Sequence, residues 1–133
     1  MSLSISEQDC PFCQAFRTPR IVASSPLAAA LFDLFPISPG HTLIVPKRHV
    51  ADWFDLTEDE RNDILELAAQ MRERLIVERN PDGWNVGINI GAAGGQTVGH
   101  VHMHLIPRYD GDRPDPRGGV RWILPDHAAY WDK

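Results

Sequence analysis

Three histidines alternate with apolar residues in the segment His100-Val101-His102-Met103-His104-Leu105. Side chains at every second position of a β-strand point to the same face of the sheet. An extended backbone therefore places the three imidazoles on one face and lets the apolar side chains pack into a core on the other. Neutral imidazole can act as a nucleophile, as a general acid or base, and as a metal ligand. The pattern is typical of an active-site strand.

Two kinds of chemistry are open to this strand when its residues are considered alone. His-x-His pairs on strands bind zinc, and the spacing does not exclude a metal centre. Many hydrolytic metal centres add a carboxylate ligand, and none follows on this strand before Asp110. The other possibility is covalent catalysis, in which one imidazole attacks the substrate. The missing carboxylate favours covalent catalysis.

A glycine-rich stretch at residues 91–99 precedes the histidines, with the sequence Gly-Ala-Ala-Gly-Gly-Gln-Thr-Val-Gly. Backbone amides in such loops can hold an anion without any net charge. The stretch has neither the Gly-Lys-Ser/Thr ending of a Walker loop nor the spacing of a dinucleotide fingerprint. It is interpreted either as a phosphate-binding loop or as an ordinary hairpin turn, in which glycine is equally common.

Two cysteines form the motif Cys10-Pro11-Phe12-Cys13. No βαβ pattern precedes the motif, which argues against a thioredoxin-type redox role. Structural zinc sites take about four ligands, usually Cys and His, so two further ligands would be needed. The alternative interpretation is a pair of free, buried thiols.

Together these motifs resemble the histidine triad (HIT) family of nucleotide hydrolases and transferases. Residues 39–49, Pro-Gly-His-Thr-Leu-Ile-Val-Pro-Lys-Arg-His, are similar to the family's first core strand and its exit, and residues 89–98 to its phosphate loop. Gln96-Thr97-Val98 resembles the fragile-histidine-triad branch, whereas Asp33 is closer to the purine phosphoramidase branch. The resemblance covers about residues 10–108, which is most of the chain.

The resemblance implies a role for each candidate residue. The middle histidine, His102, would attack the α-phosphate of a purine nucleotide and form a covalent nucleotidyl-histidine that water then releases. His104 would contact the bridging oxygen of the leaving group, and His100 completes the catalytic triad. The nucleotide- and phosphate-binding residues would be Asp33, His41, Asn89, Gly95, Gln96 and Thr97.

Asp33 has a second interpretation beside the ribose-binding role that the resemblance implies. A carboxylate can accept hydrogen bonds from both hydroxyls of a ribose, but a strand-end aspartate also commonly caps a turn. The apolar residues that could surround a base have the same ambiguity, because such residues are often simply core. They are Phe12, Ile21, Leu31 and Phe32.

The resemblance also implies a structural zinc site. Some bacterial-type members of the family, and the related uridylyltransferases, pair such cysteines with two histidines. By position the ligands here would be Cys10, Cys13, His49 and His100. A closed site of four ligands would hold the N-terminal segment against the strand that carries His102. No organic cofactor is expected.

The elements that must position these residues follow from periodicity. Residues 28–35 and 42–45 are predicted to be strands separated by a Pro- and Gly-containing turn. Thr57 and Glu60 fit a capping box that opens a helix, and apolar residues at helical spacing continue it toward Asn80. The buried positions of that helix are predicted to be Ile64, Leu67, Ala68, Met71 and Leu75.

Residues 84–90 alternate as a further strand, with Asn85, Gly87 and Asn89 on its polar face. An antiparallel hairpin across the glycine-rich stretch would set that polar face beside the histidines. We therefore predict an α+β, HIT-like fold: an antiparallel sheet of about five strands with helices packed on it. The resemblance also implies a homodimer in which one sheet continues across both subunits. The helix and residues 84–90 would form the interface.

Length, charge and composition limit the possible domain organisation, location and partners. With 133 residues, the chain is expected to form one domain over 1–133, with a core at 10–108 and a tail at 109–133. The net charge of −5 argues against nonspecific nucleic-acid binding. The polar N-terminus does not fit a signal peptide, and no apolar run reaches membrane-spanning length, so we expect a cytoplasmic protein without a membrane partner. In the tail, Arg117, Arg121 and Trp122 are candidates for contact with a distal nucleotide, a partner subunit or solvent alone.

Three classes of function remain at this point. The leading one is a hydrolase that cleaves dinucleoside polyphosphates or nucleoside phosphoramidates at the α-phosphate. The second is a nucleotidyltransferase with the same covalent intermediate, although the third triad position in that group is typically Gln and here is His104. The third is a nucleotide-binding interaction or sensor protein with little turnover.

Overall fold

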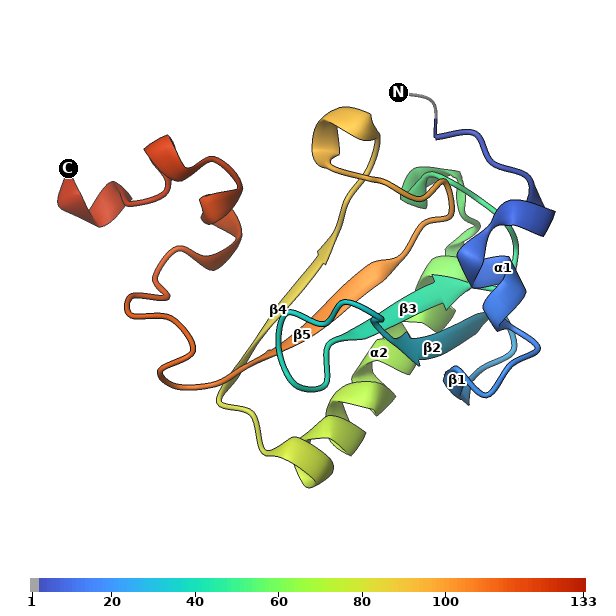
Figure 1. Cartoon of the computed structure of the whole chain (residues 1–133), viewed down its shortest axis with the longest axis horizontal. Coiled ribbons are helices and arrows are strands. Elements are labelled where there is room, and N and C mark those ends of the chain that lie inside the picture. Colours follow the sequence, from blue (N-terminus) through green and yellow to red (C-terminus); the bar gives the residue numbers. More distant parts are fainter. Residues whose placement is uncertain (1–2) are drawn as a thin grey trace.

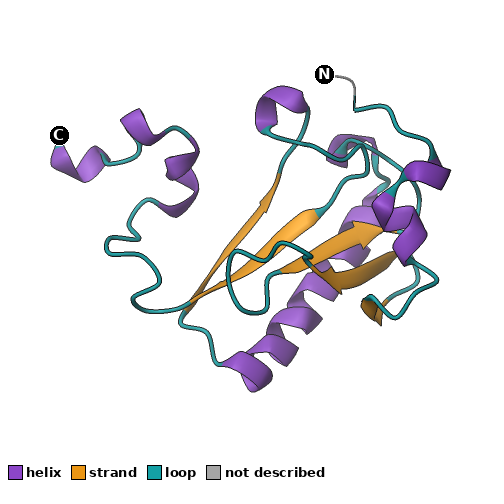
Figure 2. Ribbon diagram, in the orientation of Figure 1, coloured by secondary structure: helices purple, strands orange, loops and turns teal. Residues whose placement is uncertain are grey.

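The computed structural model describes residues 3–133 and centres on one five-stranded antiparallel sheet (Figure 1). The strand order across the sheet is β1-β2-β3-β5-β4. The strands are β1 (Ile21–Ser24), β2 (Ala28–Phe32), β3 (Thr42–Pro46), β4 (Gly83–Ile88) and β5 (Met103–Arg108). Helix α2 (Glu58–Arg79) crosses one face of the sheet, and the short helix α1 (Pro11–Ala15) lies at the other (Figure 2). The predicted α+β class is confirmed.

The sheet buries apolar side chains on both faces. On the α2 face, Ile44, Met103 and Leu105 pack with Ile64, Leu67, Met71 and Leu75 of the helix. On the opposite face, Leu43 and Val45 pack with Cys10 and Phe12 of the N-terminal segment. Because neighbours along a strand alternate between faces, His102 and His104 point away from α2. The predicted division of residues 101–105 between core and imidazole face is confirmed.

Helix α2 begins and ends where its sequence signals predict. The Thr57 side chain accepts a hydrogen bond from the Glu60 backbone N–H, and the Glu60 carboxylate accepts one from Thr57 N–H. At the other end Asn80 takes the left-handed conformation (φ 48°), which asparagine tolerates better than most residues. Glu60 also binds the Arg48 guanidinium at 2.7 Å, which joins the chain after β3 to the helix.

Strands β4 and β5 form the predicted antiparallel hairpin, in which Gly87 lies opposite His104 and Asn85 opposite Ile106. Two predicted strands end earlier than expected. β2 stops at Phe32 because the Asp33 carboxylate accepts the Phe35 backbone N–H (2.9 Å) and turns the chain. β4 stops at Ile88, before the glycine-rich stretch.

The predicted continuous histidine strand is wrong in one respect, because β5 begins only at Met103. Pro46 ends β3 and has no N–H for a further rung of the ladder. The Pro46 carbonyl is instead taken by the His100 side chain (2.8 Å), and Val101 N–H donates to the Val50 carbonyl (2.7 Å). His100 and His102 therefore lie in an extended approach to the strand, and only His104 is within it.

The N-terminal segment passes closely over this approach. A Cβ atom at Gly99 would clash with the Leu3 carbonyl oxygen, so the crossing requires glycine. Short 3-10 helices complete the chain at Glu7–Asp9, Trp53–Asp55, Ala92–Gly94, Gly119–Ile123, Pro125–His127 and Tyr130–Asp132. Within residues 3–133, no helix combines the length and apolarity needed to cross a membrane.

The tail leaves β5 and lies beyond the β4 edge of the sheet, whereas α1 lies near the β1 edge (Figure 1). Stacked cation–aromatic pairs hold it together: Arg113 lies over Trp122 at 4.7 Å, and Arg117 lies over Trp131 at 4.5 Å. Trp122 also donates its indole N–H to the Arg117 carbonyl (2.7 Å). The tail thus has an ordered shape of its own.

Candidate functional site

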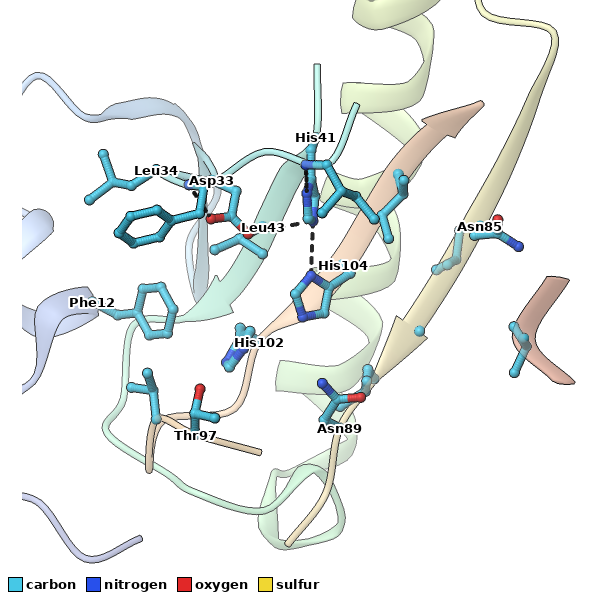
Figure 3. A pocket seen from close by; sticks show the side chains of 18 of the residues that line it. Phe12, Asp33, Leu34, His41, Leu43, Asn85, Asn89, Thr97, His102 and His104 are labelled. Carbon is cyan, nitrogen blue, oxygen red and sulfur yellow. Dashed lines mark hydrogen bonds and ion pairs between the residues drawn. The ribbon is translucent and has the colours of Figure 1, made fainter. Parts of the chain in front are cut away.

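A cavity of about 790 Å³ lies over the sheet face that carries His102 and His104. Figure 3 shows the two histidines at its floor, with Phe12 and Asp33 on one side and Asn85 and Asn89 on the other. The predicted polar face of β4 is therefore beside the histidines. The tail supplies the far wall through Gly119, Val120 and Ile123.

The hydrogen bonds of His102 define which of its nitrogens is free. His102 Nδ1 lies 2.9 Å from the His100 carbonyl oxygen, and a carbonyl can only accept. Nδ1 therefore carries the proton and donates it to this bond, which leaves a lone pair on Nε2. The ring is 8% exposed and contacts Phe12, with 5.0 Å between ring centroids. A neutral imidazole held in this tautomer presents a nucleophilic nitrogen.

A second relay fixes the tautomer of His104. The Ile37 backbone N–H donates to His41 Nδ1 (3.2 Å), so the His41 proton is on Nε2. His41 Nε2 lies 2.9 Å from His104 Nδ1 and donates to it. His104 therefore carries its own proton on Nε2, on the side of the ring away from His41 (Figure 3). The site thus combines one imidazole lone pair with one imidazole N–H donor.

Asp33 caps the turn after β2, which is one of its two predicted interpretations. Its Oδ1 accepts the Phe35 backbone N–H and caps the turn, whereas its Oδ2 lies 3.5 Å from His41 Nε2. The residue also lines the cavity. One carboxylate oxygen is therefore used structurally, and the other faces the site.

Burial keeps the imidazoles of this site neutral. It lowers the pKa of His104 to about 4, with the nearby His102 and His41 as further causes. Burial also lowers the pKa of His102 and of His41, against a smaller opposing effect of the Asp33 carboxylate. Neutral rings are the forms that the tautomer assignment requires.

Several backbone amides of the glycine-rich loop form hydrogen bonds within the loop itself. Gly94, Gly95 and Gln96 donate their backbone N–H groups to carbonyls within the loop. The Gln96 side chain is 2% exposed, accepts Gly91 N–H and donates to the Ala51 and Val98 carbonyls. Of the predicted phosphate-binding residues in and beside this loop, Asn89 and Thr97 line the cavity. Gln96 and Gly95 shape the loop, and Gly95 takes the left-handed conformation (φ 91°).

Cys10, Cys13, His49 and His100 come together behind the site and could hold a metal ion. The Nδ1 atoms of the two histidines are 3.2 Å apart, and the sulfur–nitrogen distances are 3.4, 3.4 and 3.6 Å. A tetrahedral zinc site with Zn–N of about 2.0–2.1 Å and Zn–S of about 2.3 Å places its ligand atoms about 3.3–3.8 Å apart. The four side chains therefore fit a zinc ion.

The tautomers of the two cluster histidines also fit a cation. His100 Nε2 donates to the Pro46 carbonyl (2.8 Å), and His49 Nε2 donates to the Ile5 carbonyl (2.9 Å). Each ring therefore directs a bare Nδ1 lone pair toward the other. Two lone pairs at 3.2 Å repel each other unless a cation, or the thiol hydrogens of Cys10 and Cys13 at 3.4 Å, satisfies them. Metal-ligating histidines commonly donate their second nitrogen to a backbone carbonyl in this way.

Two parts of the cavity wall were not predicted from sequence. They are Arg20, and Val120 and Ile123 of the tail, all of which line the cavity. Both parts reach the site only through the tertiary fold. The tail has too few regularly spaced apolar residues for a sequence pattern to predict which of them contact the cavity. A single arginine outside any motif likewise gives no sequence signal for a binding site.

The comparison with known proteins decides the family. The HIT domain matches residues 17–111. The chain belongs to the HIT family. It is 44% identical over 93 residues to a bis(5'-adenosyl)-triphosphatase of Dictyostelium discoideum, covering 69% of this chain and 62% of that protein. It is 37% identical over 93 residues to an AP-4-A phosphorylase of Mycobacterium tuberculosis, covering 69% of this chain and 48% of that protein. The matched region is thus about half to two thirds of these HIT relatives.

A solved HIT structure has the same fold. It is a Zn-bound histidine triad family protein of Mycobacterium smegmatis, with a TM-score of 0.72 and 28% identity. The likeness covers 83% of this chain and 86% of that one. The predicted HIT-like fold is confirmed.

Proposed function

We propose that this HIT protein is a nucleotide hydrolase that cleaves its substrate at the α-phosphate through a covalent nucleotidyl-histidine on His102. The observation that carries the proposal is the pair of opposite tautomers on neighbouring histidines. His102 offers a lone pair on Nε2 because its proton is held by the His100 carbonyl (2.9 Å). His104 offers an N–H because its Nδ1 accepts from His41 (2.9 Å). The first group can attack phosphorus, and the second can stabilise the departing oxygen.

The reaction takes two displacements. His102 Nε2 attacks the α-phosphorus, a P–N bond forms, and the bond to the bridging oxygen breaks with its electron pair leaving on that oxygen. The His104 Nε2–H donates a hydrogen bond to this oxygen as its charge grows. Water then attacks the phosphorus and gives up a proton to the solvent, the P–N bond breaks, and the electron pair returns to His102 Nε2. The products are a nucleoside monophosphate and the released leaving group.

The remaining polar residues would hold the substrate. Thr97 and Asn89 line the cavity beside His102 and would bind the non-bridging phosphate oxygens. His41 acts through His104, and Gly95 and Gln96 act by shaping the loop. Asp33 Oδ2 faces the cavity and would accept hydrogen bonds from ribose hydroxyls. The base would then lie among Phe12, Leu34 and Leu43, which line the same end.

The shape of the cavity supports a dinucleoside polyphosphate as substrate. Its lining extends from Phe12 past the histidines to Val120 of the tail, so there is space on both sides of the attacked phosphate. The relatives named as a triphosphatase and a phosphorylase act, by their names, on such compounds. A nucleoside phosphoramidate would use the same histidines but only the Phe12 side of the cavity.

Product analysis tests the proposal. The protein is incubated with a dinucleoside triphosphate, with a dinucleoside tetraphosphate and with an adenosine phosphoramidate, and products are separated by chromatography. Release of a nucleoside monophosphate, together with a trapped adduct on His102 in denatured protein, is expected. An adduct on another residue would contradict the assignment of His102. A parallel reaction of the dinucleoside tetraphosphate with inorganic phosphate distinguishes hydrolysis from transfer, because hydrolysis yields a nucleoside monophosphate and a triphosphate, whereas transfer to phosphate yields a nucleoside diphosphate and a triphosphate.

We further propose one structural zinc ion per chain, bound by Cys10, Cys13, His49 and His100. The distances and tautomers given above support this, and a Zn-bound relative has the same fold. A closed four-ligand site leaves no position for substrate, so zinc would supply stability and no nucleophile. It would fix the His100 backbone, whose carbonyl orients His102.

We also propose a homodimer with a sheet that continues through β4. This strand pairs with β5 on one side, and within residues 3–133 no strand pairs with its other side. Val86 in β4 is 50% exposed, and Val77 on α2 is 87% exposed. Light scattering of the purified protein is expected to give twice the chain mass of 14.9 kDa. A monomer mass at micromolar concentration would contradict the dimer.

A further inference from the structure

The order of the strands sets several site residues in a row across the sheet. His104 lies in β5 and pairs with Leu43 of β3. Asp33 follows the last residue of β2, which is the next strand along. Arg20 precedes Ile21, the first residue of β1, and Ile21 pairs with Leu31 near the end of β2. Moving from β5 to β1 thus passes the histidines first, then Asp33, and finally Arg20.

This row matches the order of groups in a nucleotide. Neighbouring strands are about 4.8 Å apart, so β1 is about 14 Å from β5. With the α-phosphate at His102 and the ribose at Asp33, the base extends toward the edge where Arg20 lies. Arg20 lines the same cavity as Phe12 and Asp33, so it can reach a base held there.

Arg20 is the single Lys or Arg in the lining of this cavity. Its guanidinium makes no hydrogen bond or ion pair with another residue of the part of the chain that the structure describes, 3–133. The other half-buried arginine near the site, Arg108, is by contrast bound to Asp112 at 2.8 Å and to Asn85 at 2.7 Å. A guanidinium beside a cavity with its donors unused is available to a ligand.

We propose that Arg20 recognises the base and favours a purine with a carbonyl oxygen at position 6, as in guanine or hypoxanthine. Arginine has donors only, arranged as a fork. The outer edge of guanine presents two acceptors, N7 and O6, and can take both donors at once. Adenine presents N7 beside an amino group, whose hydrogens face the guanidinium hydrogens. The inference rests on the proposed function, since it assumes a nucleotide with its phosphate at His102.

A competing role for Arg20 is simple attraction of the negative phosphate. A lysine at position 20 could fill this second role but not the whole of the first. Lysine keeps the charge but lacks the planar fork that binds two acceptors together. Substitution by lysine therefore preserves attraction of phosphate and reduces discrimination between bases.

The test measures dissociation constants of GMP, IMP and AMP by isothermal titration calorimetry, which requires no turnover. We expect the parent protein to bind GMP and IMP about tenfold or more tightly than AMP. In Arg20→Gln the preference for GMP and IMP over AMP should be lost or reversed, because a Gln amide matches N6 and N7 of adenine, and in Arg20→Lys the preference should be smaller than in the parent. Arg17→Gln is the matched control, because Arg17 is an exposed neighbour outside the cavity lining. The melting temperature of each variant checks that the fold is retained.

Four results would overturn the inference. Equal affinities for GMP, IMP and AMP in the parent exclude base reading but leave the hydrolase proposal intact. A preference that persists in Arg20→Gln assigns discrimination to other residues, and equal weakening of all three ligands in Arg20→Gln alone assigns Arg20 to phosphate. Absence of binding by all three nucleotides counts against the proposed function as well.

Discussion

His41 donates a hydrogen bond from Nε2 to His104 Nδ1 over 2.9 Å, and this contact sets the direction in which His104 can act. Ile37 N–H donates to His41 Nδ1, so the proton of His41 is on Nε2. Because that proton is donated to His104 Nδ1, the proton of His104 is on its Nε2. In the proposed reaction, His41 acts as a positioning residue, and His104 is the group that contacts the leaving oxygen. The two histidines therefore form one functional unit.

Replacing the proposed nucleophile tests the centre of the mechanism. His102→Ala should lower turnover by at least about a thousandfold while nucleotide affinity stays close to that of the parent, because no other group can form the covalent bond. Steady-state rates and calorimetry measure the two quantities. His127→Ala is the control, since His127 is exposed in the tail. Substantial residual turnover in His102→Ala would remove His102 from this role.

His104 should matter in proportion to the quality of the leaving group. His104→Ala loses the N–H that stabilises charge on the departing atom, so a poor leaving group suffers most. We expect a decrease of about a hundredfold with a poor leaving group and a much smaller one with an activated aryl phosphodiester. His41→Ala should follow the same trend more weakly. An equal loss across a series of leaving groups would show that His104 acts only in binding.

The acid side of the pH profile should lie below the ordinary histidine range. Burial lowers the pKa of His104 from 6.5 to about 4, so its neutral form persists below pH 6.5. The kcat/KM profile, which reports the free enzyme, should therefore have its acid midpoint below 6.5. A midpoint at or above 6.5 would contradict the neutral tautomers.

The same shift makes a prediction for stability. Between pH 6.5 and about 4 the unfolded chain binds a proton at His104 that the folded chain does not. The free energy of unfolding should therefore fall as the pH falls through this window. Urea unfolding at a series of pH values measures the slope. His104→Gln lacks the titrating group and should show a shallower slope; an unchanged slope would assign the effect to other groups.

Loss of one cysteine should release the metal. Cys13→Ser removes a thiolate ligand, and we expect less than one zinc per chain and a melting temperature lower by about 5 °C or more. Metal analysis of protein purified without chelators and a thermal melt provide the measurements. Gln8→Ala is a nearby control, because Gln8 is exposed and lies outside the cluster. If the parent carries no zinc and Cys13→Ser melts at the same temperature, the cysteines are merely buried thiols.

The close crossing at Gly99 predicts a specific sensitivity of the N-terminal segment. Gly99→Ala places a Cβ against the Leu3 carbonyl and must displace the segment whose Ile5 carbonyl holds His49. Metal content and melting temperature should both decrease. Gly83→Ala is the control, because its Cβ would make an ordinary van der Waals contact with the Arg108 Cβ at 3.9 Å. Equal behaviour of the two variants would show that the crossing is not needed.

Local sequence signals were sufficient for most elements of the fold. The Thr57–Glu60 capping box and the helical spacing to Asn80 located α2 to within one residue. Alternation located the hairpin of β4 and β5 and assigned each face correctly, because period-2 burial is a local property. The beginning of β5 was missed, since it depends on Pro46, more than fifty residues earlier in the chain.

The site could be predicted only in part, because several of its contacts also join residues that are far apart in the sequence. The histidines and cysteines are recognisable as types, but the bond between His41 and His104 depends on the register of β3 against β5. The use of the Gln96 side chain inside its loop depends on contacts with Ala51 and Val98. Arg20 and Val120 reach the cavity from opposite ends of the chain, where no motif marks them.

The early end of the β3–β5 ladder at Pro46 separates two levels of local stability. Amides of β5 are held by strands on both sides and should exchange with solvent only when the whole domain unfolds. The Val101 amide depends on a single bond to the Val50 carbonyl (2.7 Å), and its neighbour His100 depends on the cysteine cluster. The segment that orients the nucleophile can therefore open as a small unit while the sheet remains intact. On heating or loss of the metal, we therefore expect a population with an intact sheet but no activity to appear before the domain unfolds.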